Sequence, residues 1–149
     1  MKSIKTIEQE IIDEFDNLAD IDEKYLHLFE LGYSLPEMDP SLKNEENLVN
    51  GCQSQLWFYL RNENGRLYLE ADSDSLVIRG ITALLARLIS GRSPEEILLI
   101  KLDVIDALDI WKLASERNNG LRAMLDHLHQ QAQQMLPNTS LKGDEGADS

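Results

Sequence analysis

The stretch from Leu76 to Ile89 constrains the fold more than any other part of this chain. Its apolar side chains would cover nearly every side of a helix, and only Arg79, Gly80 and Arg87 interrupt them. A helix that is apolar around most of its circumference has to be buried by other elements. This stretch is also too short and too charged to span a bilayer. We therefore expect the central helix of a globular core, ending near Gly91.

Two amphipathic helices are expected before any strand. Apolar side chains recur at helical spacing within Ile7–Leu18, after a capping box formed by Thr6 and Gln9. A second apolar stripe lies within Tyr25–Leu31, and Gly32 is expected to end that helix. The chain thus begins with two helices whose apolar faces have to be buried in the core.

The composition then shifts toward β structure. Leu56–Leu60 and Leu67–Leu69 are separated by the turn-like Asn62–Gly65, a pattern typical of a hairpin. A short strand at Leu48 and Val49 would add a third antiparallel member. This part of the chain therefore predicts a small antiparallel sheet of about three strands.

Helices return after the central one. Ser93–Glu96 carries the pattern of a capped start with proline at the first helical position, and Val104–Leu113 suggests a further helix. Leu121–Met135 forms a long amphipathic stripe closed by Pro137. The polar residues from Asn138 to Ser149 are expected to be a disordered tail.

The segregation of these elements predicts an α+β fold, with the small sheet packed against several helices. We expect one domain over residues 1–137, followed by the tail of residues 138–149. A chain of 149 residues buries roughly 68–70% of its unfolded surface, enough for a core without a metal or disulfide.

The charge balance narrows the function. Lys and Arg number 14 and Asp and Glu number 27, which gives a net charge of −13. Such a surface repels the phosphates of nucleic acid and disfavours an anionic membrane. The N-terminal residues lack the apolar region of a signal peptide, so we expect a cytoplasmic protein.

Cys52 is the only cysteine. One thiol cannot close an intramolecular disulfide or build a thiolate metal cage. Its neighbours in Gly51–Gln55 are small or polar, as in an exposed turn, although isolated cysteines are often buried as small apolar residues. The residues alone leave core packing and thiol chemistry about equally favoured. A cysteine hydrolase using one of the three histidines (His27, His127, His129) has no local signature in its favour.

Other candidate sites have simpler structural explanations. His127 and His129 are two apart on a predicted helix and point in different directions, so they are poor metal ligands. The triplet Asp72–Asp74 is more typical of the cap of the following helix than of an acid–base pair. Trp57 and Trp111 suit core or boundary positions.

Several motifs between about Glu23 and Leu128 form a combined pattern. They are Lys24-Tyr25-Leu26, Glu30-Leu31-Gly32, Leu35-Pro36, Val49-Asn50-Gly51-Cys52-Gln53-Ser54-Gln55-Leu56-Trp57, Asp72-Ser73-Asp74, Arg79-Gly80 and Arg117-Asn118-Asn119-Gly120-Leu121 with Met124. Together they resemble the SufE family of sulfur acceptor proteins. The sequence departs from the family pattern where Glu116 separates Ser115 from Arg117.

The resemblance implies a compact α+β fold similar to that of the scaffold protein IscU. It also implies a partner, a SufS-type cysteine desulfurase that carries pyridoxal phosphate, so this chain would need no cofactor of its own. SufE-like proteins accept sulfane sulfur as a cysteine persulfide, stimulate the desulfurase and pass sulfur to a SufBCD-type scaffold for Fe–S cluster assembly.

The same resemblance assigns roles to residues. Cys52 would be the nucleophile and persulfide carrier, and no second thiol is present to divert it into a disulfide. Arg117 would stabilise the thiolate or contact the desulfurase, and Asp74 would hold the cysteine loop or the helix that follows it. The full set of supporting residues is Gly51, Gln53, Ser54, Gln55, Asp74 and Arg117.

An acidic adaptor with a structural cysteine is the alternative. Such a protein would bind and activate a partner while Cys52 only packs. The sequence leaves open whether the protein is a monomer or a homodimer, and which desulfurase is its partner.

Overall fold

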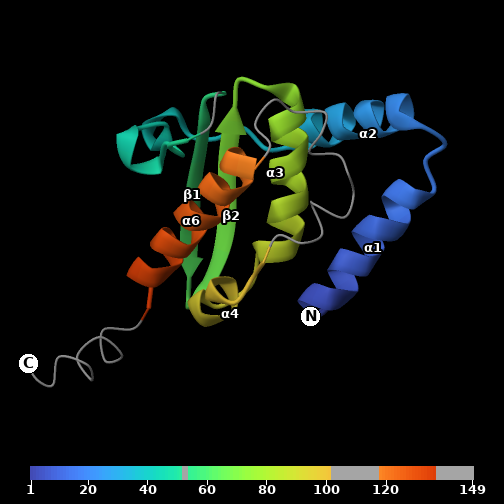
Figure 1. Cartoon of the computed structure of the whole chain (residues 1–149). Coiled ribbons are helices and arrows are strands. Elements are labelled where there is room, and N and C mark those ends of the chain that lie inside the picture. Colours follow the sequence, from blue (N-terminus) through green and yellow to red (C-terminus); the bar gives the residue numbers. More distant parts are fainter. Residues whose placement is uncertain (52–53, 102–117, 137–149) are drawn as a thin grey trace, which may run out of the picture.

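The structure is a computed structural model that describes residues 1–51, 54–101 and 118–136 (Figure 1). In it a two-stranded hairpin is flanked by α3 on one side, while α6 crosses over the hairpin. The expected α+β class is confirmed. The predicted helix at residues 104–113 and the tail at 138–149 lie outside the described residues.

The first two helices are α1 (Ile4–Asp16) and α2 (Ile21–Ser34). The capping box expected at Thr6 is wrong, because the Ser3 side chain accepts the bond from the Thr6 backbone N–H. Gly32 does not end α2, which continues to Ser34.

Gly32 and Gly80 let α2 approach α3 (Leu76–Ile89) closely. A Cβ added to Gly32 would lie 2.7 Å from the carbonyl oxygen of Leu76, and one added to Gly80 would lie 2.3 Å from that of Leu28. Neither glycine has a positive φ. Packing between the two helices, rather than helix termination, therefore accounts for glycine at position 32.

The hairpin is formed by β1 (Leu56–Glu63) and β2 (Arg66–Ser73), paired antiparallel with Leu60 opposite Leu69. The turn residues Asn64 and Gly65 have φ of 55° and 89°, as a tight hairpin turn requires. Alternate side chains of both strands are buried. The third strand is reduced, within the described residues, to a single bridge between Leu48 and Trp57.

The central helix has the bounds that the sequence predicts, and eight of its residues are buried. The side chain of Ser75 caps it. After it, Gly91 turns the chain with a φ of 88°, and the backbone of Leu67 on β2 bonds to Gly91 and to Arg92. This segment therefore lies along the outer edge of β2.

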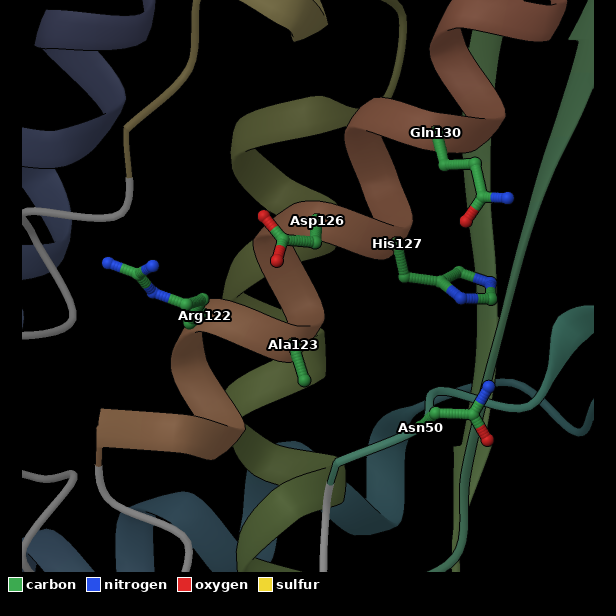
Figure 2. Close-up of a pocket in the computed structure, with 6 residues that line it drawn as sticks. All are labelled: Asn50, Arg122, Ala123, Asp126, His127 and Gln130. Atoms are coloured by element: carbon green, nitrogen blue, oxygen red, sulfur yellow. The ribbon is translucent and has the colours of Figure 1, made fainter.

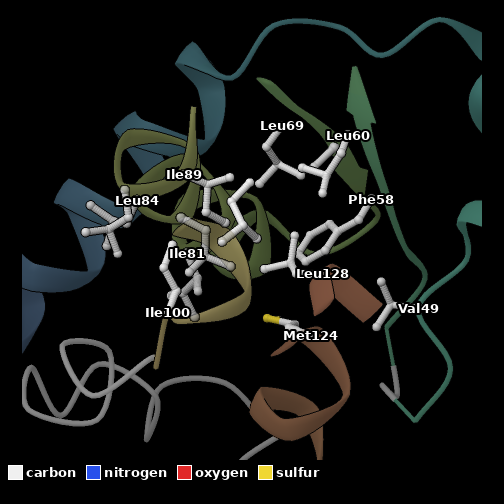
Figure 3. Packing of buried hydrophobic residues seen from close by; sticks show 14 of the residues in the cluster. Val49, Phe58, Leu60, Leu69, Ile81, Leu84, Ile89, Ile100, Met124 and Leu128 are labelled. Carbon is white, nitrogen blue, oxygen red and sulfur yellow. The ribbon is translucent and has the colours of Figure 1, made fainter. Parts of the chain in front are cut away.

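The core closes with α4 (Pro94–Leu98) and α6 (Asn118–Gln134). The predicted capping box of α4 is present at Ser93 and Glu96. In Figure 3, Leu128 of α6 lies beside Phe58 of β1 within the buried apolar cluster. None of the described helices has both the length and the apolar content needed to cross a membrane.

Candidate functional site

The predicted site is the loop around Cys52. Cys52 and Gln53 lie outside the described residues, as does Arg117. The structure therefore defines the site through the two chain segments that flank Cys52, which we call the entry arm (residues 47–51) and the exit arm (residues 54–55).

The entry arm is attached to the outer edge of β1. Leu48 forms a bridge with Trp57, and the backbone N–H of Val49 donates to the carbonyl of Leu56 over 2.8 Å. The Val49 side chain is buried in the core. The backbone before the cysteine is thus anchored to the sheet as far as Val49.

Gly51 ends the entry arm against α6. Its φ is +100°, a conformation that L side chains rarely adopt. A Cβ at this position would also lie 3.1 Å from the Cβ of Ala123. Both features favour glycine at position 51, directly before the cysteine.

The exit arm is held by the end of β2. The Ser73 hydroxyl donates to the Gln55 carbonyl over 2.6 Å, and Asp74 Oδ1 accepts from the Gln55 backbone N–H at 3.0 Å. Ser54 beside it is half-buried. The structure thus brings Asp74 to the cysteine loop, at Gln55.

The expectation that the acidic triplet caps the central helix is wrong. Ser75 supplies the cap, since its hydroxyl accepts from Ile78 N–H. Asp72 and Ser73 belong to β2, and Asp74 bonds to the exit arm instead. A run of polar residues before a helix does not show which of them takes the cap position, because each has a side-chain oxygen.

Asp72, near the end of β2, connects this strand with the loop at Lys43 and with Arg79 of α3. Its carboxylate forms ion pairs with Lys43 and Arg79. Although burial opposes ionisation, the hydrogen bond from Lys43 and the charges of both cations hold the pKa of Asp72 below its ordinary value. Arg79 also donates to the carbonyls of Gly32 and Leu35 at the end of α2.

A hollow of about 300 Å³ lies between the entry arm and α6 (Figure 2). It is lined by Asn50, Arg122, Ala123, Asp126, His127 and Gln130. Arg122 and Asp126 give its lining charges of both signs. In Figure 2 their side chains project to one side of α6, and His127 projects to the other side, where Asn50 of the entry arm lies. The hollow therefore adjoins the predicted site on the side of the entry arm.

The histidines do not form a metal site with other described residues, among which no group of three His, Cys, Asp or Glu side chains could hold an ion. His27 pairs with Glu14, and His129 faces the carbonyl of Ile100 at 3.3 Å. His127 packs edge-on against Phe58, with ring centroids 6.2 Å apart. Burial lowers its pKa, against a smaller opposing effect of the Phe58 carbonyl.

Sequence reasoning gave Ser73 only a share in the expected helix cap and gave Gln131 no role. Ser73 bonds the exit arm, and Gln131 contacts both β1 and Asn47 at the start of the entry arm. Ser73 stands in a polar triplet that drew attention to the region. Gln131 offers no such signal, because a glutamine on an amphipathic helix is ordinarily a solvent-facing residue.

The sequence matches known proteins over most of its length. Residues 9–132 match the family model SufE, described as an Fe-S metabolism associated domain. An uncharacterized SufE-like protein of Rhizobium meliloti (strain 1021) is 36% identical over 139 residues, covering 86% of this chain and 96% of the relative. A SufE-like protein of Rhizobium etli is 34% identical over 134 residues, covering 83% of this chain and 87% of the relative.

A plant protein and a solved structure add to this. The chain is 37% identical over 144 residues to SufE-like protein 1, chloroplastic/mitochondrial, of Arabidopsis thaliana, a match that covers 95% of this chain and 38% of the plant protein. A solution structure of a hypothetical protein from Thermus thermophilus has the same fold, with a TM-score of 0.70 at 20% identity over 87% of this chain and 95% of that one. On these matches the chain belongs to the SufE family, a family of Fe–S metabolism.

Proposed function

We propose that the protein accepts sulfane sulfur from a SufS-type cysteine desulfurase as a persulfide on Cys52. The proposal rests chiefly on one observation, that this member of the SufE family has a single thiol, Cys52, within one of the motifs that carry its resemblance to the family. The anchored arms on both sides of the loop support it, because they give the cysteine two defined points of attachment.

The transfer balances without an added oxidant or reductant. The Cys52 thiolate attacks the terminal sulfur of the donor's cysteine persulfide, and a new S–S bond forms on Cys52. The S–S bond of the donor breaks, and the donor cysteine leaves as a thiolate. Because this chain has no second cysteine, the product persulfide cannot collapse into an intramolecular disulfide.

The partner supplies the rest of the chemistry. In this proposal pyridoxal phosphate belongs to the desulfurase, this chain stimulates its turnover by removing the sulfur, and a SufBCD-type scaffold receives the sulfur for cluster assembly. The chain acts as a carrier and activator rather than as an enzyme, and binds no cofactor or metal. Cytosolic reductants keep an acceptor thiol such as Cys52 free of disulfides, and we propose the cytoplasm as the location of this protein.

The test is an intact-mass measurement. The protein is incubated with a cysteine desulfurase and cysteine, and its mass is taken without reductant. We expect one added sulfur, mapped to Cys52, and no added sulfur on a Cys52→Ser variant. An unmodified wild-type chain beside an active desulfurase would refute the proposal.

The same variant separates a carrier from an adaptor. If the protein is a carrier, Cys52→Ser abolishes the stimulation of desulfurase turnover. If Cys52 only packs, the variant still stimulates, and the activity comes from binding alone.

A further inference from the structure

Gln131 of α6 takes the place of a neighbouring strand at the outer edge of β1. Its Oε1 accepts from the backbone N–H of Leu60 at 2.9 Å, and its Nε2 donates to the carbonyl of Phe58 at 2.8 Å. The same Nε2 lies 3.1 Å from Oδ1 of Asn47 and 2.9 Å from Nε2 of His127. One side-chain amide thus joins β1, α6 and the start of the entry arm.

The orientation of this amide follows from its backbone partners. Leu60 N–H can only donate and Phe58 C=O can only accept, so the amide oxygen of Gln131 has to face Leu60 and its NH₂ has to face Phe58. Asn47 is fixed in the same way, because its Nδ2 donates to the carbonyl of Leu42 at 2.8 Å. Its Oδ1 therefore faces Gln131 as an acceptor.

These orientations determine the protonation of His127. Its Nε2 faces the NH₂ group of Gln131, which cannot accept a hydrogen bond, so a proton on Nε2 would set two donors against each other. A neutral ring with its proton on Nδ1 removes this conflict, and its bare Nε2 then shares the two NH₂ protons of Gln131 with the Phe58 carbonyl and Asn47 Oδ1. Burial of the ring, which lowers its pKa, favours the same neutral form.

The network reaches the segment that precedes Cys52 in the chain. Asn47 is buried and begins the entry arm, whose next residues pair with β1. We propose that Gln131 is a positioning residue that fixes the entry arm for sulfur transfer to Cys52, and that it does so only while His127 is neutral with its proton on Nδ1. This inference rests on the proposed function. It adds that Gln131 holds the entry arm and that the protonation of His127 decides whether Gln131 can do so.

Few charged groups surround His127. From its own helix, Arg122 and Asp126 line the hollow that it shares with Asn50. A second hollow beside His127 is lined by Glu46 of η2 (Glu45–Asn47) and by Tyr59 of β1. The carboxylates favour a charged ring and Arg122 opposes it, while the contact with the Gln131 amide disfavours a proton on Nε2 whatever the balance of these charges.

The first test needs no variant. The ¹⁵N and ¹H shifts of the His127 ring in the wild-type protein at pH 7.5 report its tautomer. We expect a neutral ring with the proton on Nδ1. A ring protonated on Nε2, or an imidazolium at this pH, would overturn the inference.

The second test compares Gln131→Leu with Gln133→Leu, which removes an exposed glutamine from the same helix. We expect hydrogen exchange at the Val49 and Leu60 amides to be about tenfold faster in Gln131→Leu, and sulfur uptake by Cys52 to be about threefold slower or more. Gln133→Leu should match the wild type in both measurements. Wild-type rates in Gln131→Leu would overturn the inference, whereas a wild-type chain that takes up no sulfur would refute the proposed function itself.

The third test is a pH profile. In His127→Gln the amide oxygen reaches about the position of Nε2, so the variant keeps an acceptor that does not titrate. The ratio of wild-type to variant sulfur uptake cancels the titration of Cys52 and of the desulfurase. We expect this ratio to be constant above the ordinary histidine pKa of 6.5 and to fall below it, as His127 becomes protonated. A ratio that does not change between pH 8 and 5 would contradict the role of the proton.

Discussion

Two glycines with similar backbone angles show what the position before the cysteine requires. Gly51 and Gly65 have φ of +100° and +89°, but only Gly51 has a neighbour, Ala123, within reach of an added Cβ. The left-handed conformation costs a side chain about 1–2 kcal/mol, and the close contact about 1 kcal/mol more. We expect Gly51→Ala to lower the free energy of unfolding by about 2–3 kcal/mol and Gly65→Ala by about 1–2 kcal/mol, measured by urea denaturation.

A double variant isolates the contact. In an Ala123→Gly background the added methyl at position 51 has no close neighbour, so Gly51→Ala should then cost about as much as Gly65→Ala. Equal costs for Gly51→Ala with and without Ala123 would show that the contact with α6 does not constrain the loop.

The carboxylate of Asp74 provides a second prediction at this scale. It accepts from the Gln55 backbone N–H, and an amide oxygen could accept the same bond. Since one such bond contributes about 1 kcal/mol, Asp74→Ala should speed hydrogen exchange at the Gln55 amide about fivefold, and Asp74→Asn should leave it near the wild-type rate. If Asn behaves like Ala, the negative charge matters rather than the hydrogen bond.

The cysteine motif was the part of the site that could be predicted from the sequence. The structure specifies the contacts of Gly51 with Ala123 and of Asp74 with Gln55, while the roles of both residues in sulfur transfer stay predictions. Gln131 was not predicted. Its role comes from the unpaired edge of β1, which exists because the expected third strand is only a bridge at Leu48.

At the scale of elements, the ion pairs of Asp72 connect the end of β2 with α3, α2 and the loop at Lys43. We expect Asp72→Asn to lower the free energy of unfolding by about 2 kcal/mol at pH 7, because hydrogen bonds to charged groups are lost. Urea denaturation measures the change. Asp126→Asn, which neutralises an exposed carboxylate of α6, serves as the control and should change it little.

The pH dependence of this difference has a definite sign. The folded state lowers the pKa of Asp72 from the ordinary value of 3.8, so its stabilising effect is complete above that value and disappears as the pH falls through the lower folded pKa. Wild type and Asp72→Asn should therefore converge in stability only at strongly acidic pH. A difference that shrinks already between pH 7 and 5 would indicate another titrating group.

Helix and strand predictions succeeded where the sequence carried one strong signal. This signal was the nearly continuous apolar surface for α3, the capping box for α4, and the turn at Asn64 and Gly65 for the hairpin. Gly32 was misread because a glycine that ends a helix and one that admits a neighbouring helix look alike in sequence. Only the packing of α2 on α3 distinguishes them.

At the scale of the whole molecule, the net charge of −13 constrains the charge of any protein surface that binds this chain. In the proposed complex the desulfurase needs basic groups facing this chain, because like charges across an interface cost affinity. Exposed charges are screened within about 8–10 Å at physiological salt, so such attraction acts mainly on the rate of association.

We therefore expect the association rate with the desulfurase to fall about tenfold between 50 and 500 mM salt, measured by stopped-flow or surface-based kinetics. The effect should depend on where the charge lies. Glu45 begins η2, beside the entry arm, whereas Asp16 ends α1 at a distance from it (Figure 1). Glu45→Gln should slow association and weaken its salt dependence, while Asp16→Asn, with the same change in net charge, should do neither. If the two variants behave alike, net charge alone governs the encounter and the cysteine side of the molecule is not the docking face.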